Sequence, residues 1–105
     1  MTKYELREYR KTKAELSDLD VLTRKIERHA TEELRRLYAT KRERLSGKLK
    51  RIEEAIDGLE PVERHLMRLR YIDGLEWWQV AAAIHYSVQQ THRIHARALI
   101  KLKDK

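Results

Sequence analysis

The first half of the chain places apolar residues at helical spacing among many charged ones. Their positions are Leu16, Leu19, Leu22 and Ile26, then Leu34 and Leu37, then Leu45, Leu49, Ile52, Ile56 and Leu59. The last five follow one another at intervals of four, three, four and three residues, a heptad seam that packs against another helix. Arg35 and Arg42 stand where a longer seam needs apolar residues. Residues 1–57 therefore predict two or three helices, as a helical hairpin or a coiled-coil-like pair.

Serine, glycine and proline residues predict where these helices begin and end. Ser17, with an aspartate three residues later, predicts a helix start, because a serine hydroxyl accepts hydrogen bonds from first-turn amides. Gly47 predicts a kink or a break, since glycine costs a helix about 1 kcal/mol relative to alanine. Gly58 predicts a helix end, and Pro61 suits the first turn of the next helix, where its missing N–H does no harm.

The C-terminal half predicts further helices joined by short connections. One carries Leu66, Leu69 and Ile72 on its apolar face, and Gly74 ends it because glycine readily adopts positive φ. A short helix from Glu76 to Ile84 follows.

The two tryptophans lie side by side on this short helix. Trp77 shares a face with Val80, Ala81 and Ile84, which predicts a core anchor. Trp78 points about 100° away. We expect it to be partly buried against the N-terminal helices, with contact to a partner as the alternative.

The last helix is predicted from Val88 to Leu102, after a three-residue turn that starts at His85. Ser87 and Gln90 form a capping box, in which each side chain accepts a hydrogen bond from the other residue's backbone N–H. A short helix, a tight turn and a longer helix are typical of a helix-turn-helix, whose second helix enters the major groove of DNA. The inner face holds Thr91, Ile94, Ala98 and Leu102, and the outer face holds Gln89, Arg93 and Ala96, flanked by Gln90 and His92.

Composition and charge favour a nucleic-acid partner. The chain carries 24 basic and 17 acidic residues, a net charge of +7, and such a surface attracts the phosphates of a polyanion. No apolar run approaches the ~18 residues that a membrane span needs. The N-terminal "MTKYELREYR" is charged where a signal peptide would be apolar. We expect no membrane association.

Nothing in the sequence predicts an enzyme. The absence of cysteine excludes a thiolate nucleophile and cysteine-ligated zinc. His92 and His95 lie on one helix without a carboxylate beside them, so neither a metal site nor a cofactor is expected. Acidic pairs such as Glu53 and Glu54 are interpreted as solvated helix faces that carry ion pairs.

The segment "LEPVERHLMRLRYIDGLEWWQVAAAIHYSVQQTHRIHARALIKL", Leu59 to Leu102, resembles region 4 of bacterial primary sigma factors, which recognises the promoter −35 element. The motifs "LRYIDGL", "QVAAAI" and "RIHARALIKL" carry the resemblance. The layout as a whole is similar to small phage-encoded late-gene regulators of the ArpU and RinA kind, in which a helical region precedes a sigma-like helix-turn-helix.

The resemblance implies a set of DNA-contacting residues. Val88, Gln89 and Arg93 would contact base edges, and Gln90 and His92 would lie near phosphates. The full candidate set is Ser87, Val88, Gln89, Gln90, His92, Arg93 and Arg97. Glutamine can bond bidentately to adenine and arginine to guanine, each pair worth about 1–3 kcal/mol of discrimination.

Two departures from the family pattern affect the turn and the core. His85 replaces the usual turn glycine, which is tolerable because histidine adopts positive φ more often than most residues. Thr91 replaces an aliphatic residue and is expected to weaken packing.

We therefore expect an all-α, sequence-specific DNA-binding transcription regulator, a phage or prophage late-gene activator located in the cytoplasm of a bacterial host. Residues 1–57 would be a charged helical region for oligomerisation or partner binding, and residues 58–105 the DNA-binding domain. The expected partners are double-stranded DNA, a second copy bound through the N-terminal helices, and RNA polymerase. The alternatives are a DNA-packaging module similar to a small terminase subunit and a protein that binds polymerase without contacting DNA.

Overall fold

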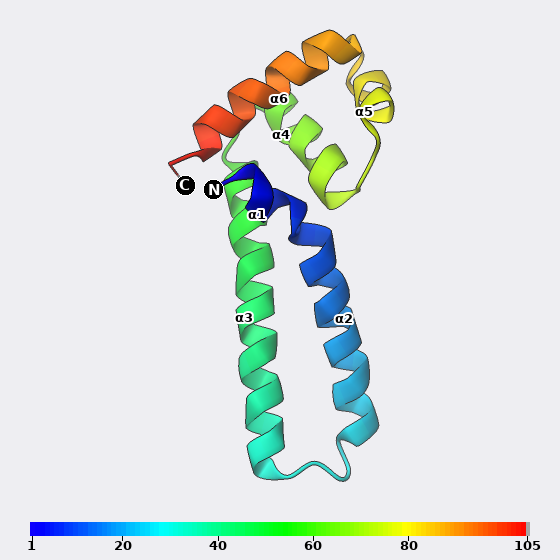
Figure 1. Cartoon of the computed structure of the whole chain (residues 1–105), viewed down its shortest axis with the longest axis vertical. Coiled ribbons are helices and arrows are strands. Elements are labelled where there is room, and N and C mark those ends of the chain that lie inside the picture. The colour runs from blue at the N-terminus through cyan, green and yellow to red at the C-terminus, as the bar shows by residue number, and fades with distance from the viewer. Residues whose placement is uncertain (105) are drawn as a thin grey trace.

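The computed structural model describes residues 1–104, in which every regular element is helical. The elements are α1 (Lys3–Arg7), α2 (Tyr9–Ile26), α3 (Glu32–Asp57), α4 (Pro61–Met67), the π-helical turn η1 (Arg68–Ile72), α5 (Trp77–Ile84) and α6 (Val88–Leu102). Figure 1 shows α2 and α3 as a long antiparallel hairpin, with α4, α5 and α6 grouped at the end where α3 finishes. The predicted all-α fold with an N-terminal helical hairpin is confirmed.

The heptad seam of α3 packs inside the chain itself. All five seam residues, Leu45 to Leu59, are buried. Tyr9 and Leu19 of α2 are buried as well, whereas Leu22 and Leu37 near the hairpin turn are exposed. Because α1 and α2 share the core that this seam enters, a second copy of the chain is not needed to cover it.

The predicted helix boundaries inside the hairpin are wrong at two positions. α2 runs unbroken through Ser17, whose side chain is exposed in the middle of the helix. α3 likewise runs unbroken through Gly47. Leu45 and Leu49, on either side of this glycine, are buried, and burial of one leucine contributes about 1.5–3 kcal/mol. That gain exceeds the cost of one glycine in a helix.

The helix boundaries predicted at Gly58, Pro61 and Gly74 are correct. Gly58 is the C-cap of α3 and Pro61 is the first residue of α4. Gly74 has φ of 73° after η1. This positive φ favours glycine. A Cβ at Gly74 would lie 2.2 Å from Nη1 of Arg10, so a side chain here would also displace the Arg10 guanidinium.

Gly47 offers a simple test of the continuous helix. A Cβ built at Gly47 meets no atom within 4 Å. Gly47→Ala should therefore raise the free energy of unfolding by about 0.5–1 kcal/mol, because alanine has less backbone freedom to lose. Urea unfolding measures the change. Gly74→Ala, by contrast, should destabilise the protein, and a destabilising effect of Gly47→Ala would contradict an unbroken α3.

One hydrophobic core joins the hairpin to the C-terminal helices. Leu6 and Ile56 belong to the same buried cluster as Leu66, Val80 and Leu102, and none of the five is accessible to solvent. The phenol of Tyr9 donates a hydrogen bond to Glu53, which is half-buried. The expectation that Glu53 lies on a solvated helix face is therefore wrong. Burial and this carboxylate raise the pKa of Tyr9 to about 12. The base of the hairpin and the C-terminal helices thus pack as one body.

Candidate nucleic-acid interface

The turn between α5 and α6 has the predicted geometry. His85 ends α5 in the left-handed conformation, with φ of 61° and ψ of 39°. The Gln90 N–H donates to Oγ of Ser87, and the Ser87 N–H donates to Oε1 of Gln90, both at 3.1 Å. This capping box fixes the start of α6 relative to α5.

A second capping box, which the sequence pattern did not predict, begins α5. The Glu76 N–H donates to Oε1 of Gln79 at 2.9 Å, and the Glu76 side chain accepts from the N–H of Gln79. The sequence does contain the spacing of a capping box here, because Gln79 follows Glu76 by three residues. Glutamate is not among the residues preferred at this position, and the helix was therefore predicted to start one residue too early.

The inner face of α6 is buried as expected. The buried residues are Thr91, Ile94, His95, Ala98 and Leu102. The Thr91 hydroxyl donates to the carbonyl of Ser87 at 2.8 Å. The expected weakening by Thr91 is therefore limited, because its buried hydroxyl has a hydrogen-bond partner.

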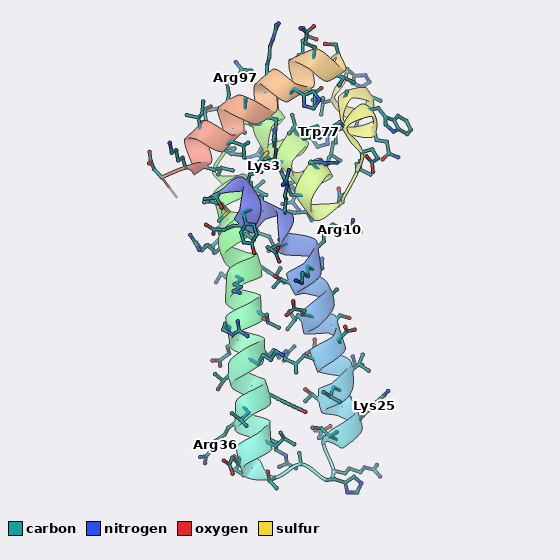
Figure 2. The ribbon with its side chains drawn as sticks, in the orientation of Figure 1. Lys3, Arg10, Lys25, Arg36, Trp77 and Arg97 are labelled. Atoms are coloured by element: carbon teal, nitrogen blue, oxygen red, sulfur yellow. The ribbon has the colours of Figure 1, made fainter. Side chains whose placement is uncertain are left out.

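All seven candidate DNA-contacting residues are exposed on α6 and its N-cap. Ser87 and Gln90 are occupied by the capping box. Within residues 1–104, Gln89, Arg93 and Arg97 make neither a hydrogen bond nor an ion pair. Figure 2 shows Arg97 pointing away from the hairpin, and Arg97 lines a groove between α6 and the start of α4. The outer face of α6 thus presents one amide and two guanidinium groups that the fold does not use.

Trp77 is a support for α6, but it is only half-buried. Its ring lies 4.7 Å from the His92 ring and 4.6 Å from the His95 ring, measured between centroids. The Arg70 guanidinium covers it at 4.7 Å. Trp77 packs against the core as predicted, with a cation closing its outer side.

Trp78 is 66% exposed, so its expected burial against the N-terminal helices is wrong. α5 packs on α4, η1 and α6, with Val80 and Ala81 buried, while the hairpin packs on α4 and η1. No helix of the hairpin covers the side of α5 from which Trp78 projects.

A buried polar pair lies beneath Trp77. The Tyr71 hydroxyl and Nε2 of His95 are 2.6 Å apart, and both residues are buried. Burial lowers the pKa of His95 to about 4, with smaller contributions from the positive charges of Lys3 and of other nearby groups. His95 is therefore neutral at pH 7.

Two arginines outside α6 have partners within the fold. Arg68 forms an ion pair with Asp57 at 3.2 Å, and Arg70 donates to the carbonyl of Leu75 at 2.8 Å. In the described part of the chain, no group of three or more His, Asp or Glu side chains could hold a metal ion. None of the described helices combines the length and the apolar content that crossing a membrane requires.

Comparison with known families matches residues 55–104 to the family Sigma-70, region 4. Comparisons with curated proteins and with solved structures gave no match. The matched segment contains α4, η1, α5 and α6, together with the capping box and the exposed face described above. This family is a DNA-binding regulatory domain without catalytic function. The C-terminal part of the chain therefore carries a sigma region 4-like helix-turn-helix domain, which indicates DNA binding.

Proposed function

We propose that this protein is a sequence-specific transcription regulator that places α6 in the major groove. The observation that carries the proposal is the pair Gln89 and Arg93, four residues apart on the outer face of a helix whose start is fixed by a capping box. Residues at this spacing share one face. Glutamine suits adenine, and arginine suits guanine.

The neighbouring residues complete the proposed contact surface. Val88 offers an apolar contact for a thymine methyl group, while Gln90 and His92 lie near phosphates. Arg97 lies one turn beyond Arg93 and would contact the backbone of the same groove.

Selection of bound sequences from random duplex DNA tests this function. The protein should enrich a discrete motif, and Arg93→Ala should weaken binding to it about 5- to 150-fold, the equivalent of 1–3 kcal/mol, while relaxing preference at one base pair. Arg36→Ala, at the far end of the hairpin in Figure 2, is the matched control and should bind as the wild type does. Equal binding to all duplexes would overturn sequence-specific recognition.

The proposal includes a role as a phage or prophage late-gene activator that contacts RNA polymerase and forms a homodimer. The layout of a helical region before a sigma-like domain supports it. Two half-sites on DNA would strengthen a small domain's affinity. The dimer contact must lie on the outside of the hairpin, because the α3 seam is buried.

Light scattering and polymerase capture test these partners. A dimer supports the regulator, whereas a ring of many copies would instead support a packaging module. Polymerase capture that survives Gln89→Ala and Arg93→Ala, together with the absence of any footprint, would support a protein that binds polymerase without contacting DNA.

A further inference from the structure

A cleft lined by basic residues lies where the hairpin meets the helix-turn-helix. Its volume is about 230 Å³. Lys3, Arg7 and Arg10 enter it from α1 and α2, and Arg70 enters from η1 beside Trp77. We call the cleft that these four side chains line the basic cleft. Figure 2 shows Lys3 and Arg10 on the part of the N-terminal helices nearest Trp77.

No ion pair among the described residues neutralises the basic cleft. Across residues 1–104, no carboxylate forms an ion pair with any of the four side chains, although Arg51 elsewhere on the hairpin pairs with Glu5 at 3.1 Å. Lys3, Arg7 and Arg10 follow the i, i+4, i+7 spacing of one helix face. Four cations gathered without a counter-charge repel one another, and an anion in the cleft would relieve that repulsion.

Two side chains of the basic cleft, those of Arg10 and Arg70, lie against the segment from Gly74 to Trp77. The Arg10 guanidinium lies against the backbone of Gly74, where only the absence of a side chain leaves room for it. Arg70 is fixed by the carbonyl of Leu75 and by the Trp77 ring. The charges of Lys3, Arg7 and Arg70 all contribute to lowering the pKa of His95, in keeping with their gathering around one point.

The basic cleft is continuous with the exposed face of α6. Arg70 covers one side of Trp77, and the His92 ring packs on the same tryptophan. His92 is adjacent to Arg93 on the outer face. In a helix-turn-helix complex, the first helix crosses the DNA backbone while the second enters the groove. Here the first helix is α5, and it begins at Trp77, next to the cleft.

We propose that Lys3, Arg7 and Arg10, together with Arg70, bind phosphates of the DNA backbone beside the site contacted by α6. The inference rests on the proposed function and extends it, because it makes α1 and the start of α2 part of the DNA-binding surface. The partner is the phosphodiester backbone of the same duplex. The contacts carry no base preference, since every nucleotide has the same phosphate.

A charge-matched pair of triple variants tests this inference. Lys3→Gln, Arg7→Gln and Arg10→Gln together remove three charges from the cleft, and Lys25→Gln, Arg28→Gln and Lys41→Gln together remove three from exposed positions on the outer half of the hairpin. Both variants change the net charge from +7 to +4. Affinity for the selected motif is measured at several salt concentrations, and hydroxyl-radical footprints are recorded for each protein.

The cleft variant should bind all duplexes more weakly by a similar factor and keep its base preference. The slope of log K against log salt should become shallower by about 0.9 for each phosphate that the variant no longer neutralises, or about 2.7 for three phosphates. Protection should disappear from one edge of the footprint. The double variant Lys3→Gln and Arg7→Gln leaves Arg10 packed on Gly74, and the slope should become shallower by about 1.8.

Each outcome separates the inference from the function on which it rests. If the wild type selects a motif but the cleft variants keep its salt slope and its footprint, only the basic cleft is overturned. An equal fall in slope for both triple variants would show an effect of net charge and would also overturn it. If the wild type selects no motif, the proposed function fails, and the inference fails with it.

Discussion

Leu6→Ala should lower the free energy of unfolding by about 2–5 kcal/mol and should destabilise the helix-turn-helix along with the hairpin. Leu6 lies in α1, is fully buried, and belongs to the cluster that contains Val80 of α5 and Leu102 of α6. Truncating it leaves a cavity in a core that both parts of the chain share.

The two tryptophans make this prediction measurable. Trp77 and Trp78 are the only tryptophans, and both lie in α5, so urea unfolding followed by their fluorescence reports the helix-turn-helix. The same fall in stability should appear in circular dichroism, which reports all the helices. Leu37→Ala, at a position 62% exposed near the hairpin turn, is the control and should change stability by less than about 0.5 kcal/mol. A tryptophan transition unaffected by Leu6→Ala would mean that the two parts unfold independently.

The second large effect is a loss of stability in acid that depends on His95. Its folded-state pKa is about 4, below the ordinary value of 6.5, chiefly because of burial. Between these pH values the unfolded chain binds a proton at this histidine that the folded chain does not. Stability therefore falls as the pH drops through this window, by about 3 kcal/mol in all.

His95→Gln isolates this contribution. Glutamine does not titrate, and its side chain can still form a hydrogen bond with the Tyr71 hydroxyl. The wild type should lose more stability than the variant between pH 6.5 and pH 4, while acid effects from carboxylates are common to both. Proton NMR of the imidazole should show His95 titrating near pH 4. Titration near pH 6.5, or parallel pH profiles for the two proteins, would contradict a buried neutral histidine.

The local design of the helix-turn-helix could be predicted from its residues. His85 at positive φ, the box of Ser87 and Gln90, and the end of the preceding helix at Gly74 all follow from short-range sterics and hydrogen bonds. The two faces of α6 follow from helical periodicity alone. The match of residues 55–104 to a sigma family is consistent with these same signals.

Predictions failed where distant packing outweighed a local preference. Ser17 can cap a helix, and Gly47 weakens one, but both helices run through these positions. Apolar side chains are buried on either side, namely Tyr9 and Leu19 in α2 and Leu45 and Leu49 in α3. Helical periodicity placed Trp78 away from the core face of α5, but it did not show whether another helix covers that side. Whether a tryptophan is covered depends on which helices pack beside it, and here the hairpin packs on α4 and η1.

Interactions within a few residues were therefore enough to predict the helices of the C-terminal half, the turn between α5 and α6, and the two faces of α6. Only the packing of distant segments shows that α1 shares a core with α6 and that His95 contacts Tyr71. It also brought Lys3, Arg7 and Arg10 to Arg70, some sixty residues away along the chain. The physical reason is that such contacts arise from the burial of apolar surface between distant segments, which no local pattern records.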